Sequence, residues 1–200
     1  MLNIRTRQTY LKELGMYNGA IDGIEGKGTK NGYRLLQNKY FTRAGDKDGI
    51  YGNNTDILLQ SAHNVLHNCK HFTLTEFRCK CGAKYCTGYP AVVDSYLAKD
   101  VESMRAKYGA IEITSGLRCK IWNRLVGGVS GSAHTKGKAV DIFNKNISYN
   151  LNNRKSAIEY FLTLPNSAMG YCNGYMHWKG SNPRNHKSRT MGISTHLQVK

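Results

Sequence analysis

The sequence predicts an α+β protein, with a small three-helix module at its N-terminal end and a compact domain with a small antiparallel sheet behind it. Three observations predict this class. The motif Asp-Gly-Ile-x-Gly-x-x-Thr begins at Asp22 and again at Asp48, as in repeated supersecondary units. Apolar residues recur at helical spacing in several segments, and short alternating segments follow in the second half. The 200 residues, 40% of them hydrophobic, allow one or two small cores and exclude a large multidomain protein.

The repeated motif organises residues 1–66. Each copy is typical of a helix, a glycine-rich turn and a threonine, here Thr29 or Thr55, whose side-chain oxygen caps the following helix. The expected helices are 7–14, 29–40 and 55–66. Residues 67–76 have no strong period and form the predicted linker, so the second domain is expected to span 77–200.

The second domain alternates between helical and extended patterns. Apolar residues at helical spacing predict a helix within 90–108, which Gly109 ends. The expected strands are 111–114, 139–143 and 194–200, with a further helix over 155–164. Helices beside a few short strands favour an α+β layer with an antiparallel sheet.

The composition is strongly basic, with 29 Lys and Arg against 13 Asp and Glu and a formal charge of +16. Such a field attracts polyanions, either nucleic acid or the phosphates and carboxylates of a bacterial wall. The aromatic residues form no recognisable stacking motif with the basic ones, so we expect no nucleic-acid partner. We find neither a secretory leader nor a membrane-spanning run, and expect a monomer held in the cytoplasm of the producing cell until release.

The chain has six cysteines, of which Cys79, Cys81 and Cys86 lie close together in the sequence. Without a signal peptide, free thiols or a metal cluster are favoured over disulfides. With Cys69 or His71, these three cysteines are able to hold a structural zinc ion. Their spacing is not a common zinc-ribbon pattern, so buried or loosely paired thiols are the preferred interpretation.

The most informative stretch runs from Ser132 to Ile142. It places His134 before a glycine turn and Asp141 on a predicted strand, seven residues later. An imidazole and a carboxylate in this arrangement can converge on one cation, and zinc accepts both kinds of ligand. On chemistry alone, a histidine and an aspartate at this spacing are more often unrelated.

Two resemblances extend this interpretation. The order of Gln8, Gly15, Tyr17 and the two Asp-Gly-Ile repeats resembles the three-helix peptidoglycan-binding module of bacteria and phages, which attaches hydrolases to cell walls. The pattern Ser-x-His-x-x-Gly-x-Ala-x-Asp-Ile at 132–142 resembles the signature of the zinc D-Ala-D-Ala carboxypeptidases. That family includes vancomycin-resistance D,D-dipeptidases and phage L-alanyl-D-glutamate endopeptidases, and the similarity runs from about residue 72 onwards.

The second resemblance implies a Zn²⁺ site with His134 and Asp141 as ligands, and Arg118 as the cation that binds a substrate carboxylate or carbonyl. The third ligand is His196 or His177. We favour His196, because a terminal strand holds a ligand more rigidly than a loop edge. His177 then remains as a proton carrier.

One feature departs from the family pattern. Many relatives place an acid three residues before the last histidine, and here that position is Ile193 or Gly174, neither of which moves a proton. Glu112 is an alternative general base, and His186, in a basic loop, is expected to be solvated.

Two functions follow. In the first, the protein is an endolysin-like zinc metallopeptidase that degrades peptidoglycan by cutting a D-Ala-D-Ala or L-Ala-D-Glu bond of the stem peptide. In the alternative, it is a catalytically inactive cationic cell-wall-binding protein.

Overall fold

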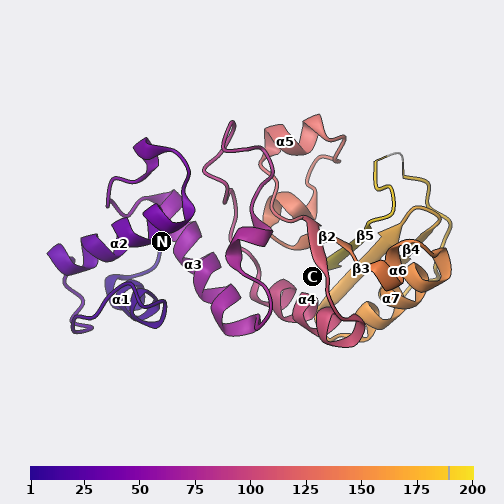
Figure 1. Cartoon of the computed structure of the whole chain (residues 1–200), viewed down its shortest axis with the longest axis horizontal. Coiled ribbons are helices and arrows are strands. Elements are labelled where there is room, and N and C mark those ends of the chain that lie inside the picture. Colours follow the sequence, from indigo (N-terminus) through magenta and orange to yellow (C-terminus); the bar gives the residue numbers. More distant parts are fainter. Residues whose placement is uncertain (189) are drawn as a thin grey trace.

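A computed structural model describes residues 1–188 and 190–200. Across these residues, seven α-helices accompany a five-stranded antiparallel sheet, which confirms the predicted α+β class. The helices are α1 (Ile4–Glu13), α2 (Lys27–Tyr40), α3 (Asn53–Asn68), α4 (Ser95–Tyr108), α5 (Lys120–Leu125), α6 (Lys145–Ser148) and α7 (Leu151–Thr163). The strands are β1 (Glu112–Ser115), β2 (Ala139–Phe143), β3 (Ser167–Cys172), β4 (Tyr175–Trp178) and β5 (Thr195–Val199). Figure 1 shows α1–α3 at one end of the molecule and the sheet at the other.

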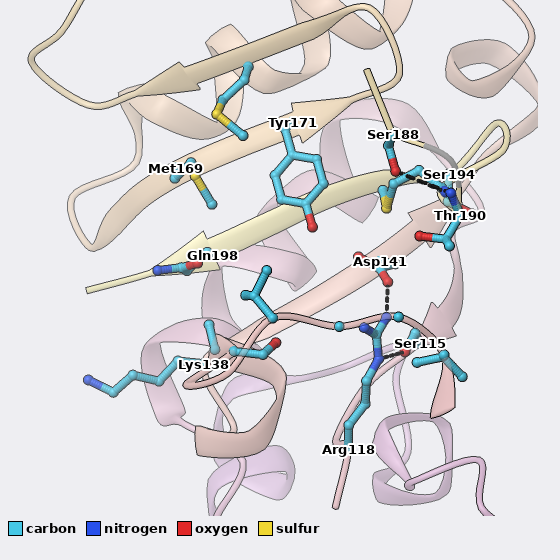
Figure 2. A pocket seen from close by; sticks show the side chains of 18 of the residues that line it. Ser115, Arg118, Lys138, Asp141, Met169, Tyr171, Ser188, Thr190, Ser194 and Gln198 are labelled. Atoms are coloured by element: carbon cyan, nitrogen blue, oxygen red, sulfur yellow. Dashed lines mark hydrogen bonds and ion pairs between the residues drawn. The ribbon is translucent and has the colours of Figure 1, made fainter. Parts of the chain in front are cut away.

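The sheet has the order β1-β2-β5-β3-β4, so the C-terminal strand lies in its centre. Asp141 of β2 pairs with His196 of β5, and His196 pairs in turn with Tyr171 of β3. Because side chains directly opposite each other across a sheet point to the same face, these three form a row. Figure 2 shows Asp141 and Tyr171 on this face, and helix α7 covers the other face, where Ile158 packs against Gly170.

The predicted strands 111–114, 139–143 and 194–200 correspond to β1, β2 and β5. The hairpin of β3 and β4 was not predicted. Its first strand, with the sequence SAMGYC, contains few residues that favour a strand, and pairing with β5 compensates for this weak propensity.

The glycine turns of the N-terminal module are held by glutamine side chains. Gln8 Nε2 donates to Asp22 Oδ1 at 2.7 Å and to Thr29 Oγ1 at 3.2 Å, while its Oε1 accepts from the backbone N–H of Gly23 at 2.9 Å. Gln37 makes the same contacts one repeat later, with Asp48, Thr55 and Gly49. The repeat in the sequence is therefore a repeat of hydrogen-bonded turns.

The prediction that the two threonines cap their helices is wrong. Helices α2 and α3 follow Gly26 and Gly52, which have no side-chain cap, and each threonine is the third residue of its helix. The buried hydroxyls of Thr29 and Thr55 instead satisfy the glutamine of the preceding helix, a contact that a local capping rule does not anticipate.

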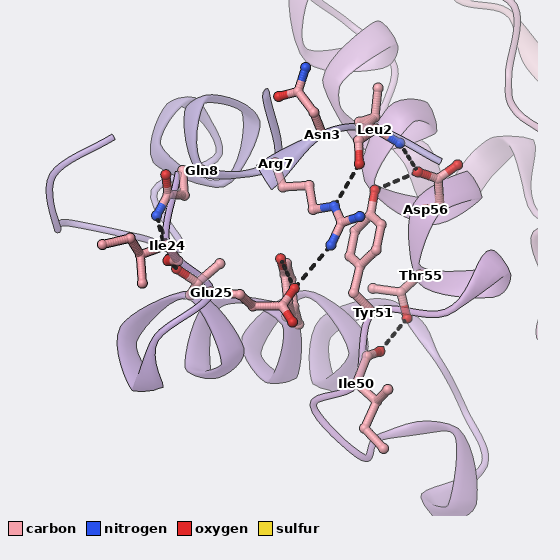
Figure 3. Close-up of polar contacts among 12 residues, drawn as sticks. Leu2, Asn3, Arg7, Gln8, Ile24, Glu25, Ile50, Tyr51, Thr55 and Asp56 are labelled. Atoms are coloured by element: carbon pink, nitrogen blue, oxygen red, sulfur yellow. Dashed lines mark hydrogen bonds and ion pairs between the residues drawn. The ribbon is translucent and has the colours of Figure 1, made fainter. Parts of the chain in front are cut away.

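Arg7 joins the two repeats, as Figure 3 shows. Its guanidinium donates to Glu25 at 2.9 Å and to the carbonyl oxygen of Leu2 at 2.8 Å, and it lies 3.7 Å from the ring centre of Tyr51. Glu25 and Tyr51 occupy the same position in the two repeats. One cation of α1 thus contacts the equivalent turns that precede α2 and α3.

Helix α3 packs against the second domain. Asn64 Nδ2 donates to the carbonyl oxygen of Val93 at 2.8 Å, and the backbone N–H of Val93 donates to Ser61 Oγ at 3.0 Å. Phe72 and Leu74, within the predicted linker, are buried in a core that continues from the module into the domain. Among the described residues, no helix is both long enough and apolar enough to cross a membrane.

Candidate metal centre

A pocket of about 1160 Å³ opens on the face of the sheet that α7 leaves uncovered. Its walls come from β1, the start of α5, the turn before β2, strands β3 and β4, and the loop that leads to β5. Figure 2 shows Arg118, Asp141 and Tyr171 directed toward its centre.

Three potential metal ligands meet beside this pocket. His134 Nε2 lies 3.2 Å from His196 Nδ1 and 3.3 Å from Asp141 Oδ1, and His196 Nδ1 lies 2.9 Å from the same carboxylate oxygen. Tetrahedral zinc with ligands at 2.0–2.1 Å holds its donor atoms about 3.3 Å apart. The three residues therefore fit a zinc ion in donor type and in spacing, which leaves a fourth position for water or substrate.

The local sequence explains this convergence. His134 lies in a 3-10 turn (Ala133–Lys136) that ends at Gly137, whose φ of 73° is left-handed. A Cβ at Gly137 would lie 1.8 Å from the carbonyl oxygen of Val92, so only glycine allows this close approach. Strand β2 begins two residues later and aligns Asp141 with His196.

The second nitrogen of His134 is also occupied. Its Nδ1 lies 2.8 Å from the carbonyl oxygen of Gly116, so it carries the proton and leaves the lone pair of Nε2 facing the group. Histidine ligands of metals commonly make such an outer hydrogen bond.

Burial and mutual contacts set the protonation of the group. Burial raises the pKa of Asp141, but its contacts with the imidazoles of His134 and His196 outweigh this effect and hold the pKa far below its usual value. Burial lowers the pKa of His196, against the opposing effect of Asp141. A carboxylate beside a neutral imidazole is the state that binds a metal.

Arg118 contacts the other oxygen of Asp141. Its guanidinium forms an ion pair with Asp141 Oδ2 and donates through Nε to Ser115 Oγ at 2.8 Å. Arg118 lines the pocket, as its expected role in binding substrate requires.

The structure does not bring His177 to this group. It lies on β4 between Met176 and Trp178, which line the pocket, so its own side chain points to the opposite face. There His177 Nδ1 lies 2.6 Å from Glu159 of α7, and Nε2 lies 2.8 Å from the carbonyl oxygen of Ser181. These contacts give no support to a role as a proton carrier.

Two residues at the pocket were missed. The ring of Tyr171 stacks on His196, with centroids 4.3 Å apart. His186, expected to be solvated, lines the pocket and makes an edge contact with Tyr171 at 4.9 Å. Neither residue lies in a sequence motif. The pairing of Tyr171 with His196 follows only once strand β3 is known, and the sequence did not predict that strand.

Comparison with known proteins gives one family. The family model for peptidase M15 matches residues 70–172, just over half of the chain, and includes Arg118, His134 and Asp141. His196 lies beyond the matched residues, so its assignment as a ligand rests on geometry. No curated protein matches the chain. The signature at 132–142 lies within the matched residues, and the family model covers more than half of the chain. The chain therefore belongs to the peptidase M15 family of zinc peptidases.

Proposed function

We propose that the protein is a zinc peptidase that cleaves a peptide bond in the stem peptide of peptidoglycan. The observation that carries the proposal is the convergence of His134 Nε2, Asp141 Oδ1 and His196 Nδ1 beside the pocket. When bound there, zinc would polarise the scissile carbonyl and activate water.

The side chains of the pocket supply the remaining functions. Arg118 presents a guanidinium beside Asp141 and can bind a carboxylate or carbonyl of the substrate. Burial raises the pKa of Tyr171 to about 12, so its hydroxyl stays protonated and can donate a hydrogen bond. Burial and the charge of Arg184 lower the pKa of His186, which leaves a neutral imidazole able to accept a proton.

The charge of the pocket favours an anionic peptide. Six lysine and arginine residues besides Arg118 line it: Lys80, Lys136, Lys138, Arg184, Lys187 and Lys200. The stem peptide carries free carboxylates, and the wall around it is polyanionic. The repeated turns of the N-terminal module resemble those of wall-binding modules, which supports delivery of the pocket to insoluble peptidoglycan after release from the producing cell.

One observation favours the alternative, a protein that binds the wall without cleaving it. Among the described residues that line the pocket, Asp141 is the one carboxylate, and it belongs to the ligand group. A peptidase here takes its proton carrier from His186 or Tyr171.

Purified peptidoglycan tests both functions. The full chain is incubated with walls, and mass spectrometry of the released fragments identifies the bond: loss of a terminal D-alanine, or a new N-terminus at D-glutamate. We expect products that disappear on chelation, return with zinc and are absent with His134→Ala. Sedimentation of His134→Ala with the walls at low and high salt measures binding separately. Binding without products from the wild-type, zinc-loaded protein would establish the inactive alternative.

A further inference from the structure

Four cysteine sulfurs meet at a second place in the domain. The Sγ atoms of Cys79, Cys81, Cys86 and Cys119 all lie within 4.8 Å of one another, and those of Cys81 and Cys86 are 3.5 Å apart. The first three belong to the loop that precedes α4, whereas Cys119 caps the start of α5. The structure thus brings a distant fourth cysteine to the cluster that is visible in the sequence.

The fourth residue is neither of the two, Cys69 and His71, that the sequence offered as a possible fourth ligand. Cys69 donates to the carbonyl oxygen of Ala98 at 3.4 Å, and His71 pairs with Glu102 at 2.5 Å, so both face α4. Cys119 takes their place: its backbone N–H donates to Cys79 Sγ, and its own sulfur lies within 4.8 Å of the sulfurs of the other three cysteines.

The spacing of the sulfurs suits a tetrahedral ion. With Zn–S bonds of about 2.3 Å, the sulfurs of a four-cysteine site lie about 3.8 Å apart. Cys79, Cys81 and Cys119 are each less than 10% exposed, and Cys86 is partly exposed. All four are free thiols. A closed set of four sulfurs, three of them buried, is the arrangement of a structural zinc site rather than of a catalytic one.

Backbone N–H groups already point at these sulfurs. The N–H of Cys119 donates to Cys79 Sγ at 3.4 Å, that of Gly88 to Cys86 Sγ at 3.3 Å, and that of Trp122 to Cys119 Sγ at 3.4 Å. Such donors orient thiolate ligands and offset their negative charge.

The loop is shaped to return to the cluster. Gly82 and Ala83 both adopt left-handed φ angles, of 64° and 63°, and the N–H of Cys79 donates to the carbonyl oxygen of Gly88 at 2.8 Å. A left-handed backbone conformation is unfavourable for alanine, and it persists only where other contacts fix the turn. Here, the turn brings Cys86 back beside Cys81.

We propose that Cys79, Cys81, Cys86 and Cys119 bind one structural zinc ion, in addition to the ion of the His134 group. This ion ties the 79–88 loop to the start of α5. Its site shares no residue with the catalytic group and holds whether or not the protein cleaves peptides.

The proposed ion lies next to two cations of the pocket. Lys80, between two of the cysteines, lines the pocket, and Arg118 directly precedes Cys119. An ion in the four-cysteine site would therefore hold in place both the loop that carries Lys80 and the segment that carries Arg118. Loss of its ion is expected to loosen the loop while leaving His134, Asp141 and His196 in place.

Zinc content of the full chain tests the proposal. The protein is purified with a reducing agent and without chelators, and zinc is measured per chain. We expect two ions in the wild-type protein, one in Cys86→Ser and one in His134→Ala, and none when both are changed. Cys69→Ser, which keeps a donor toward Ala98, is the matched control and keeps two. His63→Ala tests the third group of possible ligands, Glu13, His63 and His67, and is also expected to keep two zinc ions.

The wild-type protein provides a test that no folding defect confounds. X-ray absorption at the zinc edge is expected to show Zn–S scattering at about 2.3 Å beside the shorter Zn–N and Zn–O distances. Titration with an organomercurial is expected to release one zinc as four thiols react, with the second ion retained. Absence of sulfur from the zinc shell, unchanged zinc in Cys86→Ser, or disulfides among these four cysteines in protein purified without a reductant would overturn the proposal.

Discussion

The Nδ1 atom of His134 lies 2.8 Å from the carbonyl oxygen of Gly116, a residue where a Cβ would lie 2.4 Å from the carbonyl oxygen of Phe77. The orientation of the imidazole therefore depends on a turn that only glycine fits. The peptide that fixes His134 is itself fixed by its approach to the backbone of Phe77, whose carbonyl also accepts from Leu117 at 2.8 Å.

Gly116→Ala is therefore expected to weaken zinc binding at the His134 group. The added methyl group displaces the carbonyl that orients the imidazole, and loss of such an outer contact commonly costs about 10- to 100-fold in metal affinity. Competition with a chromophoric chelator, in the Cys86→Ser background, measures the affinity. Gly45→Ala, where a Cβ meets nothing within 4 Å, should leave it unchanged; equal affinities in the two variants would contradict the prediction.

Replacing each of the two competing histidines by alanine tests which of them is the third zinc ligand. His196→Ala is expected to lose the zinc of this group together with activity, because its Nδ1 shares Asp141 Oδ1 with His134. His177→Ala is expected to keep the metal, since its ring contacts Glu159 on the opposite face of the sheet. Metal analysis of both proteins decides; the reverse pattern would assign the ligand to His177.

Arg118→Lys is expected to lower kcat/KM by about 100-fold while zinc remains bound. The guanidinium contacts Ser115 and Asp141 Oδ2 at once, which a single ammonium does not reproduce, whereas Oδ1 of Asp141 keeps its place among the ligands. Steady-state kinetics and zinc analysis are compared with Arg124→Lys, an exposed control on α5. If Arg118→Lys had the kcat/KM of the wild-type protein, the role of Arg118 would be limited to its ion pair with Asp141.

The proton carrier is tested at His186. His186→Gln is expected to reduce kcat by about 10²- to 10⁴-fold with the metal retained, because a neutral imidazole at the pocket is lost. His177→Gln serves as the comparison. If activity instead falls in His177→Gln and survives in His186→Gln, the original assignment of the proton carrier to His177 is restored.

The sequence predicted the parts of the site that are local. His134 and Asp141 lie seven residues apart around one glycine turn, and His196 was favoured as the third ligand on a terminal strand, which the structure pairs with Asp141. Contacts between distant segments were missed, because no local period reports them. Tyr171 reaches His196 only through a hairpin of weak strand propensity, and Cys119 reaches Cys79 across 40 residues.

The same limit explains the threonines of the repeats. Their spacing from the glycine turn matched a capping rule, but the deciding partner is a glutamine on the preceding helix, 21 residues from Thr29. The motif was recognised correctly as a repeat, while the chemistry of its threonine depended on tertiary contact.

The buried carboxyl group of Asp100 leads to a prediction about the stability of the protein. This residue of α4 is 2% exposed, its Oδ2 has no hydrogen-bond partner, and burial raises its pKa to about 6, against the attraction of Lys179 and Lys99. Between its unfolded pKa of 3.8 and about 6, the folded state binds more protons than the unfolded one, so this residue lowers the free energy of unfolding as pH rises through that window. Asp100→Asn removes the buried charge and is expected to stabilise the protein by about 2 kcal/mol at pH 7, with little gain at pH 4. Urea unfolding at both pH values measures the difference, with the change Glu112→Gln of an exposed acid at neutral pH as the control for charge alone. An equal gain at both pH values would show that the pKa of Asp100 is the same in the folded and the unfolded protein, and would contradict the prediction.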